Sequence, residues 1–360
     1  MEKTVAKTVS HGDLAPPFST RFTQRYAVAH PFAGAGLAFA AQTPDLAIAV
    51  SKAGGIGALG VGFMSAQQLR EAIHAIRAAT SAPFNINFIT CFDNDAQIRV
   101  CAEEAVPVAS FHWGHPSKEH LNLLLDAGCD VWEQVGTVED GLKAAGDGVC
   151  TVIPQGWEAG GHNYGGMGTL AFVPAMVDAL NGDALVLASG GISDGRAVAA
   201  CLSLGADGVW VGTRLVASHE AHVHPHHHDA LIKAGGDETI RSGIFGPEMP
   251  HFNPMRLLRN QVVDAYTHKL EEVPKERGEM PVIGETLVHG KPHTKRKFDV
   301  MLPVPETTGD FEEMPWLSGQ GVGLIKDIQP AGAIVETMMA DAADVLRRTT
   351  VQITDVARGR

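Results

Sequence analysis

The sequence predicts an α/β fold, a (β/α)8 TIM barrel, because apolar strand-like runs alternate with segments of helical period from residue 27 to residue 213. Eight runs of the first kind are separated by seven of the second, and strands that alternate with helices are parallel. The runs are mostly continuous rather than alternating in polarity, which is typical of strands buried on both faces. The active site of such a barrel lies at the carboxyl ends of its strands.

The elements follow one another in a regular order. The predicted strands are residues 27–36, 55–60, 83–89, 106–114, 130–136, 149–156, 184–191 and 208–213. The predicted helices between them are residues 45–54, 66–80, 94–105, 118–128, 137–146, 170–182 and 194–206. A closing amphipathic helix is predicted over residues 328–349.

The chain changes character after the last predicted strand. The stretch from about residue 218 to 308 is richer in His, Pro and charge, and "MRLLRNQVVDAYTHKLEEV" within it looks helical. We therefore expect a barrel domain over residues 1–217 and an inserted, mostly helical subdomain over residues 218–308, before the last barrel helix. Residues 309–360 are expected to form a C-terminal segment that returns to the barrel.

Composition narrows the class of protein and its partners. The formal net charge is −13 and the basic residues form no stripe, which argues against a nucleic-acid partner. The five cysteines form no C-x-x-C pair, so a reducing compartment is expected. No segment has the apolar length of a signal peptide core or a membrane span. We expect a cytoplasmic protein with no membrane partner, and the sequence permits a homodimer.

Two glycine-containing loops follow predicted strands near the end of the barrel. They are "ASGGISDGR", Ala188–Arg196, and "GADGVWVGTR", Gly205–Arg214. Loops after the last two strands of this fold often form a phosphate site, because their backbone N–H groups are free. The alternative is two ordinary strand-to-helix turns.

Two other motifs favour structural interpretations. "GGIGALG" contains a G-x-G-x-x-G pattern at Gly55, Gly57 and Gly60, but it forms a predicted strand instead of following one, so it predicts a barrel strand and not a dinucleotide site. The segment 219–228 holds six histidines, interrupted by Pro225. No cysteine or well-placed carboxylate completes a ligand set, so a solvated helix start is predicted and no metal site.

The stretch "VIPQGWEAGGH", Val152–His162, combines a predicted strand end with a loop of glycines. Gln155, Glu158 and His162 are its polar groups. Histidine, with an ordinary pKa near 6.5, suits proton abstraction at neutral pH. From the residues alone, His162 is either a catalytic base or a structural histidine, and Glu158 has no assigned role.

These motifs together resemble the nitronate monooxygenase family, formerly called 2-nitropropane dioxygenases. The resemblance is carried by "AVSKAGGIGALG", "PFNIN", "FHWGHP", "QGWEAGGH", "GTLAFVPAMVDAL", "ASGGISDGR", "GADGVWVGTR", "FGPEMPHFNPMRLLRN" and "MPWLSGQGVGLIK". It implies an FMN-dependent barrel enzyme in which His162 is the catalytic residue. The phosphate loops would be Ser189, Gly190, Gly191, Gly212 and Thr213. The other implied flavin contacts are Gly36, Leu37, Asn87, Gln134, Gln155, Gly156, Gly160, Gly161, Gly319 and Gln320.

The resemblance also implies a reaction. An alkyl nitronate or nitroalkane would react with O2 to give a carbonyl compound and nitrite, with no metal. His162 would remove the α-proton of a neutral nitroalkane or, when protonated, bind the nitronate anion. The alternative is NAD(P)H:quinone or enoyl-thioester reduction on the same flavin barrel, since fold does not settle chemistry. The family usually has a Pro-Met pair at the end of the first strand, where this chain has Gly36 and Leu37.

Overall fold

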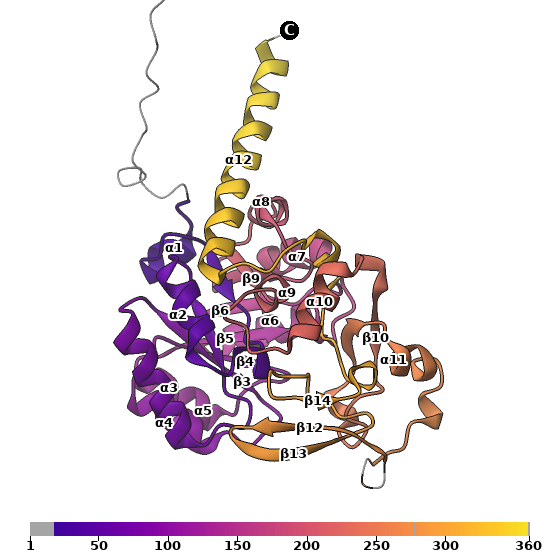
Figure 1. The fold of residues 1–360 in the computed structure, drawn as a ribbon. Helices are drawn as coiled ribbons and strands as arrows, with labels where there is room; N and C mark the ends of the chain where they lie inside the picture. Colours follow the sequence, from indigo (N-terminus) through magenta and orange to yellow (C-terminus); the bar gives the residue numbers. More distant parts are fainter. Residues whose placement is uncertain (1–17, 277, 279, 359–360) are drawn as a thin grey trace, which may run out of the picture.

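A computed structural model of the protein describes residues 18–276, 278 and 280–358, with side chains up to residue 350. Eight parallel strands form a barrel surrounded by helices (Figure 1), in the order β1-β9-β8-β6-β5-β4-β3-β2. A bridge between Ala33 and Ile56 joins β1 to β2 and closes the ring. The strands are β1 (Phe32–Gly34), β2 (Gly57–Gly60), β3 (Phe84–Ile89), β4 (Val108–His112), β5 (Asp130–Val135), β6 (Thr151–Pro154), β8 (Leu185–Ser189) and β9 (Gly208–Val211). The predicted (β/α)8 barrel is confirmed, strand by strand.

A helix follows each of the first seven barrel strands along the chain, as predicted. They are α2 (Pro44–Lys52), α3 (Ala66–Ala79), α4 (Asp95–Glu103), α5 (Lys118–Asp126), α6 (Val138–Gly146), α7 (Thr169–Leu180) and α8 (Gly195–Ser203). Their starts are specified locally: the Ser65 side chain accepts from the backbone of Gln68, and Asp194 accepts from Arg196 and Ala197. The short helix α1 (Arg21–Tyr26) precedes the first strand.

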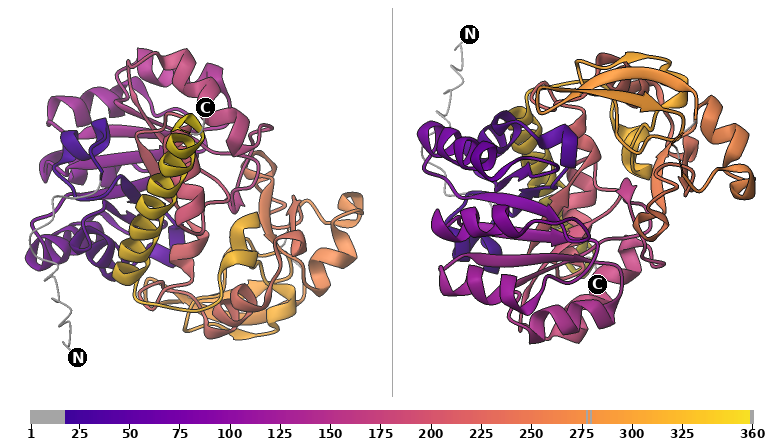
Figure 2. Two further views of the ribbon diagram at one scale, coloured as in Figure 1. Left: turned by 90° about the horizontal axis from the view of Figure 1, so that it is seen from above. Right: turned by 90° about the horizontal axis from the view of Figure 1, so that it is seen from below.

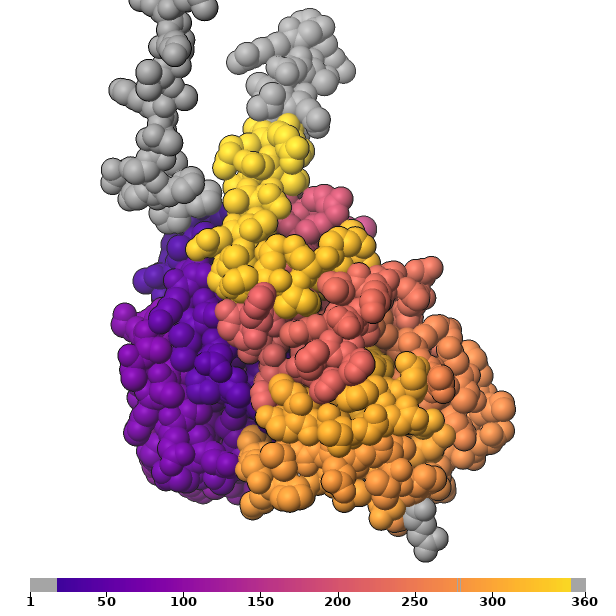
Figure 3. Space-filling view, viewed as in Figure 1, coloured from indigo at the N-terminus to yellow at the C-terminus, as the bar shows by residue number. Residues whose placement is uncertain are grey.

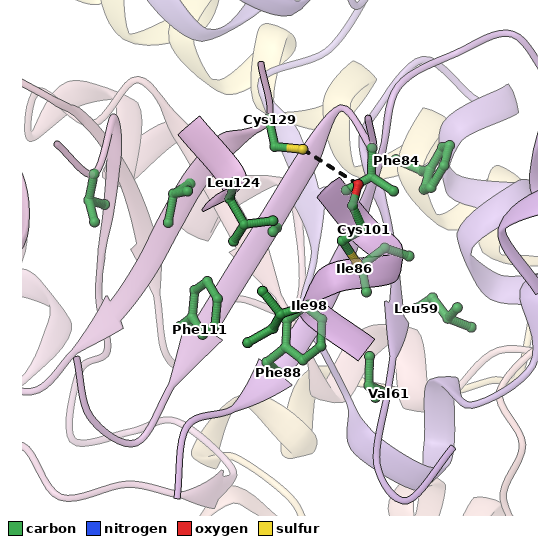
Figure 4. Close-up of a cluster of buried hydrophobic side chains, with 14 of the residues drawn as sticks. Leu59, Val61, Phe84, Ile86, Phe88, Ile98, Cys101, Phe111, Leu124 and Cys129 are labelled. Atoms are coloured by element: carbon green, nitrogen blue, oxygen red, sulfur yellow. Dashed lines mark hydrogen bonds between the residues drawn. The ribbon is translucent and has the colours of Figure 1, made fainter. Parts of the chain in front are cut away.

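The core has two layers that leave only the carboxyl ends of the strands free. Between strands and helices, outward-facing strand residues pack against helix residues such as Ile98 and Leu124 (Figure 4). Inside the barrel, large side chains including Trp132, Leu187 and Trp210 fill the centre. The interior of the barrel is therefore a packed core, and within the barrel a cavity can form only at the carboxyl ends of the strands.

The long helix α12 (Ala331–Arg358) takes the place of the eighth barrel helix. It packs on α8 and α2 through a shared cluster that includes Val198, Leu46 and Met338, and its C-terminal half projects away from the barrel (Figure 1). The contact with α8 is close, since a Cβ added at Gly195 would lie 2.6 Å from the Met338 carbonyl oxygen. In the described part of the chain, no helix is both long and apolar enough to cross a membrane.

Residues 218–308 lie beside the mouth of the barrel (Figures 2 and 3). They contain α10 (Pro225–Lys233), η2 (Gly236–Glu238), β10 (Thr239–Ser242), η3 (Pro250–Phe252), β11 (Met255–Leu258), α11 (Gln261–Tyr266), η4 (Leu270–Glu272), β12 (Val282–Val288) and β13 (Lys291–Arg296). Two three-stranded sheets, β10-β11-β7 and β13-β12-β14, use these strands together with β7 (Gly161–His162) and β14 (Thr308–Gly309). The remaining short elements are η1 (Ala38–Ala41), α9 (Thr213–Val216), η5 (Phe311–Glu313) and η6 (Gln320–Leu324).

The prediction that this insertion is mostly helical needs correction. Met255–Leu258, predicted as helix, is a strand that pairs with β10 on one side and β7 on the other. All four of its residues are buried. A short, continuously buried run shows no period that separates strand from helix, so its neighbours in space decide its conformation.

Candidate active site

The carboxyl ends of the barrel strands surround a cavity. Fourteen of the sixteen residues singled out in the sequence line it: Gly36, Leu37, Asn87, Gln134, Gln155, Gly160, Gly161, His162, Ser189, Gly190, Gly191, Gly212, Thr213 and Gly319. These residues come from loops that are far apart in the sequence. The structure therefore brings nearly the whole predicted set to one place.

His162 lies at the end of the loop after β6, and both its backbone and its ring are held by contacts with the insertion. It belongs to the two-residue strand β7, where it pairs antiparallel with Met255 of β11. Its imidazole stacks on the ring of Phe252, with centroids 3.6 Å apart and an interplanar angle of 18°. Its Nε2 atom is buried and has no hydrogen-bond partner among the described residues. The imidazole is thus held in orientation by packing, with one nitrogen left free for a ligand.

The backbone of His162 is fixed by two further side chains of the cavity. Its carbonyl oxygen accepts from Gln155 Nε2 at 3.0 Å and from His112 Nε2 at 3.2 Å. Because a carbonyl can only accept, His112 carries its proton on Nε2, and its Nδ1 accepts from Gln134 Nε2 at 2.9 Å. His112, at the end of β4, was not predicted as a site residue; it lies within the "FHWGHP" motif, but only its spatial position reveals the contact.

Both histidines are held neutral at physiological pH. Burial lowers the pKa of His112 to about 4. Burial, together with the neighbouring His112, lowers the pKa of His162 to about 3. The ordinary histidine pKa near 6.5 therefore does not apply to His162, because burial and the neighbouring His112 disfavour its cation. The resting His162 is an acceptor and not a cation.

The two glycine loops form another part of the cavity wall, next to the His162 loop. Gly190 and Gly191 have φ values of +115° and +71°, which residues with a Cβ rarely adopt. A Cβ at Gly190 would also lie 2.8 Å from Thr169 Oγ1. Gly212 precedes α9, whose first residue, Thr213, lines the cavity. Backbone N–H groups are therefore concentrated here, as a phosphate requires.

The C-terminal segment closes over the His162 loop through a backbone contact. A Cβ at Gly160 would lie 2.5 Å from the Ser318 carbonyl carbon, and one at Gly319 would lie 2.9 Å from the Gly160 nitrogen. Gly319 N also donates to Thr213 Oγ1 at 2.9 Å. The loop after β6, the loop after β9 and the C-terminal segment are thus tied to one another at a single point.

The end of the first strand contacts the end of the third. A Cβ at Gly36 would overlap the Asn87 side chain, so only glycine leaves room for that amide. Asn87 Nδ2 in turn donates to Ser110 Oγ at 2.8 Å. Gly36 and Leu37 line the cavity although they replace the expected Pro-Met pair.

Two of the predicted residues lie outside the cavity wall. Gly156 lies beneath the loop, where its N–H donates to Ser189 O at 2.8 Å. Gln320 has an exposed side chain, and its backbone N–H donates to Glu158 O at 2.9 Å. Glu158 itself now has a role: its carboxylate accepts from the backbone nitrogen and hydroxyl of Thr169, both at 2.9 Å, and so caps α7.

The histidine-rich segment is mostly structural. His224 caps α10, and His228 Nε2 contacts the Val216 carbonyl oxygen at 2.9 Å. His227 is fully buried, lines the cavity and donates from Nε2 to Leu317 O at 3.3 Å, and burial lowers its pKa to about 4. No group of three or more metal-ligating side chains occurs within the described ranges. The predicted solvated helix start is thus partly wrong, because His227 faces inward.

The cavity wall fits a large polar cofactor. No Asp, Glu, Lys or Arg lines it in the part of the chain that the structure describes. An anionic group would therefore be held by backbone N–H groups at the glycine loops. Gln155 Oε1, in the loop that leads to His162, is buried without a partner among the described residues and can accept from a ring N–H. A phosphate at the glycine loops and a planar ring near His162 would satisfy both sets of groups.

Comparison with known proteins shows a family for this chain and relatives with more than one named activity. The model of the family described as nitronate monooxygenase matches residues 19–96 and 89–341. A relative from Mycobacterium tuberculosis, 29% identical over 93% of this chain and 99% of its own, is named (3aS,4S,5R,7aS)-5-hydroxy-7a-methyl-1-oxo-octahydro-1H-indene-4-carboxyl-CoA dehydrogenase.

Two solved structures share the whole architecture. FabK from Thermotoga maritima has a TM-score of 0.77 and 31% identity, covering 93% of this chain and 99% of its own. A nitroalkane oxidase from Streptomyces ansochromogenes has a TM-score of 0.73 and 25% identity, covering 92% of this chain and 99% of its own. The similarity thus extends over the barrel and the insertion together.

Proposed function

The chain belongs to the nitronate monooxygenase family, and from that premise we propose that it is an FMN-dependent enzyme that converts alkyl nitronates and nitroalkanes with O2 to a carbonyl compound and nitrite. The supporting observation is the buried Nε2 of a neutral His162, without a partner among the described residues, in a cavity that two glycine loops also line. The nitroalkane oxidase from Streptomyces ansochromogenes, which shares this fold at 25% identity, supports the same class of substrate.

The cofactor would be held by backbone groups of the glycine loops and by amide side chains of the cavity wall. Backbone N–H groups of Gly190, Gly191 and Thr213 suit its phosphate. Asn87, Gln134 and Gln155 offer amides to the polar edge of its ring. FMN bound there supplies the one-electron chemistry that couples the nitronate to dioxygen, while the protein binds and orients the reactants.

The protein's own chemical step is the movement of one proton. His162 Nε2, in the tautomer that leaves it unprotonated, accepts the α-proton of a nitroalkane, and the carbon–hydrogen electron pair moves into the nitro group to give the nitronate. The imidazolium then lies beside an anion, which offsets the unfavourable burial of its charge. For a substrate supplied as nitronate, this step is not needed. Two nitronates and one O2 balance two carbonyl products and two nitrites.

A second candidate rests on the named relatives. The Mycobacterium tuberculosis relative is called a dehydrogenase of a carboxyl-CoA compound, and FabK shares the fold at 31% identity. The same cavity could therefore serve an NAD(P)H-dependent reductase acting on a quinone or an enoyl thioester. His162 would then place a proton on the reduced substrate.

One experiment separates the two functions. The protein, reconstituted with FMN, is mixed without oxygen with propionate 3-nitronate or with NADH and NADPH while the flavin absorbance is followed; nitrite is then measured under air. We expect flavin reduction by the nitronate, nitrite under air and no rapid bleaching by NADH or NADPH. Rapid bleaching by a nicotinamide without nitrite formation would support the reductase, and a protein that cannot be reconstituted with flavin would refute both.

A further inference from the structure

Five aromatic side chains form a continuous line of ring contacts along the rim of the candidate active site. Phe39, Phe63, Phe92 and Trp113 each come from the loop after one of the strands β1 to β4, and Phe252 comes from η3. Consecutive centroids lie 5.6, 5.3, 5.6 and 5.3 Å apart in the order Phe39–Phe63–Phe92–Phe252–Trp113. We call these five residues the aromatic arc.

The aromatic arc connects the reaction centre with solvent. Phe252, the fourth ring in this order, stacks on His162 and lines the cavity, and it is only 4% exposed. Phe63, the second ring, is 50% exposed. Ile89 and Leu302 also line the cavity. A chain of ring contacts therefore links the imidazole, through Phe252 and Phe92, to an exposed ring.

Packing of the insertion against the barrel does not explain the whole arc. Phe252 contacts Phe92 and Trp113, and Trp113 Nε1 donates to His251 O at 2.7 Å, so these residues do join the insertion to the barrel. The ring contacts of Phe63 are with Phe39 and Phe92, which both belong to barrel loops. Phe63 is thus an exposed apolar ring that is linked through Phe92 to Phe252 in the cavity wall, and apolar surface that continues from a cavity wall is typical of a ligand contact.

The chemistry of the rings defines what they can bind. They carry no charge, and the single polar group among them, Trp113 Nε1–H, is already bonded to the backbone. A polar or anionic ligand group would lose its hydration here without compensation. Ring faces accept methylene groups at many positions, so they suit a flexible alkyl chain.

We propose that the aromatic arc binds the apolar tail of the substrate, so that the enzyme acts on nitronates and nitroalkanes with a long unbranched alkyl chain. The assignment rests on the proposed function only in placing the reacting carbon at His162. The binding of the tail itself requires no turnover.

The first test is a chain-length series on the FMN-loaded enzyme. With 1-nitropropane, 1-nitrohexane and 1-nitrodecane, we expect KM to fall with length, by up to about fourfold for each methylene that is buried. Phe63→Ala should raise KM for 1-nitrodecane by about tenfold, from the loss of aromatic contact area, and leave 1-nitropropane unchanged. Leu170→Ala, which truncates a 72% exposed side chain on α7, is the matched control and should change neither value.

The second test measures binding without chemistry. Calorimetric titration of the loaded enzyme should show tighter binding of 1-decanol than of 1-hexanol, and Phe63→Ala should remove most of that difference. If no nitroalkane is turned over but the alkanol difference and its loss persist, the proposed function fails and the arc assignment stands. If nitrite is formed but neither KM nor alkanol affinity depends on length or on Phe63, the arc assignment is wrong. A dimer that Phe63→Ala dissociates, with unchanged alkanol affinity, also overturns it and makes a second copy the occupant.

Discussion

Glycines of the loops after β6 and β8 and of the C-terminal segment line the cavity with backbone, whereas Phe252 lines it with a ring of the aromatic arc, whose other members come from the loops after β1 to β4. On the first side, Gly160, Gly190 and Gly319 bring backbones together at distances that leave no room for a Cβ. On the second side, aromatic rings from successive loops contact one another through side chains. His162 lies between them, with its backbone in the glycine side and its ring stacked on Phe252.

The difference between backbone and ring walls indicates that the two sides bind different ligand groups. Backbone N–H groups have fixed positions, so a wall made of them suits a group of constant chemistry such as a phosphate. Side-chain faces can change by substitution without moving the backbone, so a wall made of rings suits a part of the substrate that varies. We infer that the glycine side holds the cofactor and the aromatic side selects the substrate.

The largest effect is expected for substitution of His162, which lies between the glycine side and the aromatic side. His162→Asn should lower kcat/KM for a neutral nitroalkane by about 10²–10⁴-fold, because the variant lacks the proton acceptor. Turnover of a substrate supplied as nitronate should fall much less, and FMN should stay bound, since no glycine of the cradle is altered. Steady-state nitrite assays on both substrates check this. Equal losses on both substrates would show that His162 does not act as the base.

A smaller effect, a loss of FMN affinity, is expected when a side chain is added to a glycine of the cavity wall. In Gly160→Ala, the Cβ would lie 2.5 Å from the Ser318 carbonyl carbon, so the C-terminal segment must move. An overpacking cost of about 1–3 kcal/mol corresponds to roughly a 5- to 160-fold loss of FMN affinity. Gly166→Ala, in the same loop with nothing within 4 Å of the added atom, is the matched control. The measurement is flavin fluorescence titration. Unchanged affinity in Gly160→Ala would place the cofactor elsewhere.

The sequence predicted the glycine side better than the aromatic side, for a physical reason. Glycines after apolar strands, as at Gly190 and Gly191, mark positions that need a left-handed backbone, and that need is local. The eight strands and the helices between them were also predictable, because each repeats one local pattern.

Contacts made across long distances in the chain left no such local signal. Phe252 lies 90 residues after His162, and neither the stacking of the two rings nor the pairing of Met255 with His162 could be predicted from local pattern. The same holds for the bonds from His112 and Gln155 to the His162 carbonyl oxygen, and for the low pKa that burial gives His162. These features depend on the assembled cavity.

The decrease in the free energy of unfolding at acid pH should depend on the buried His162. The pKa of His162 is lowered to about 3 in the folded protein, against about 6.5 for an unfolded histidine. The unfolded chain therefore binds the proton first, and stability is lost as pH falls below about 6.5 toward 3. His162→Asn should reduce this slope by up to about 1.4 kcal/mol per pH unit. Urea unfolding of both proteins between pH 7 and pH 4 measures it, and identical slopes would show that the ring is not held neutral.

The smallest effect is expected for Glu158, to which the sequence alone assigned no role. Glu158 caps α7 through Thr169, and its carboxylate has no place in the cavity wall. Glu158→Ala should therefore lower the free energy of unfolding by about 1 kcal/mol, as the loss of a helix cap does. FMN affinity and KM should stay within a factor of two, because the Glu158 carboxylate does not line the cavity. Urea unfolding and flavin titration on the same preparation separate the two effects. A loss of flavin without a loss of stability would assign Glu158 to the cofactor side after all, and would mean that this side is not built from backbone alone.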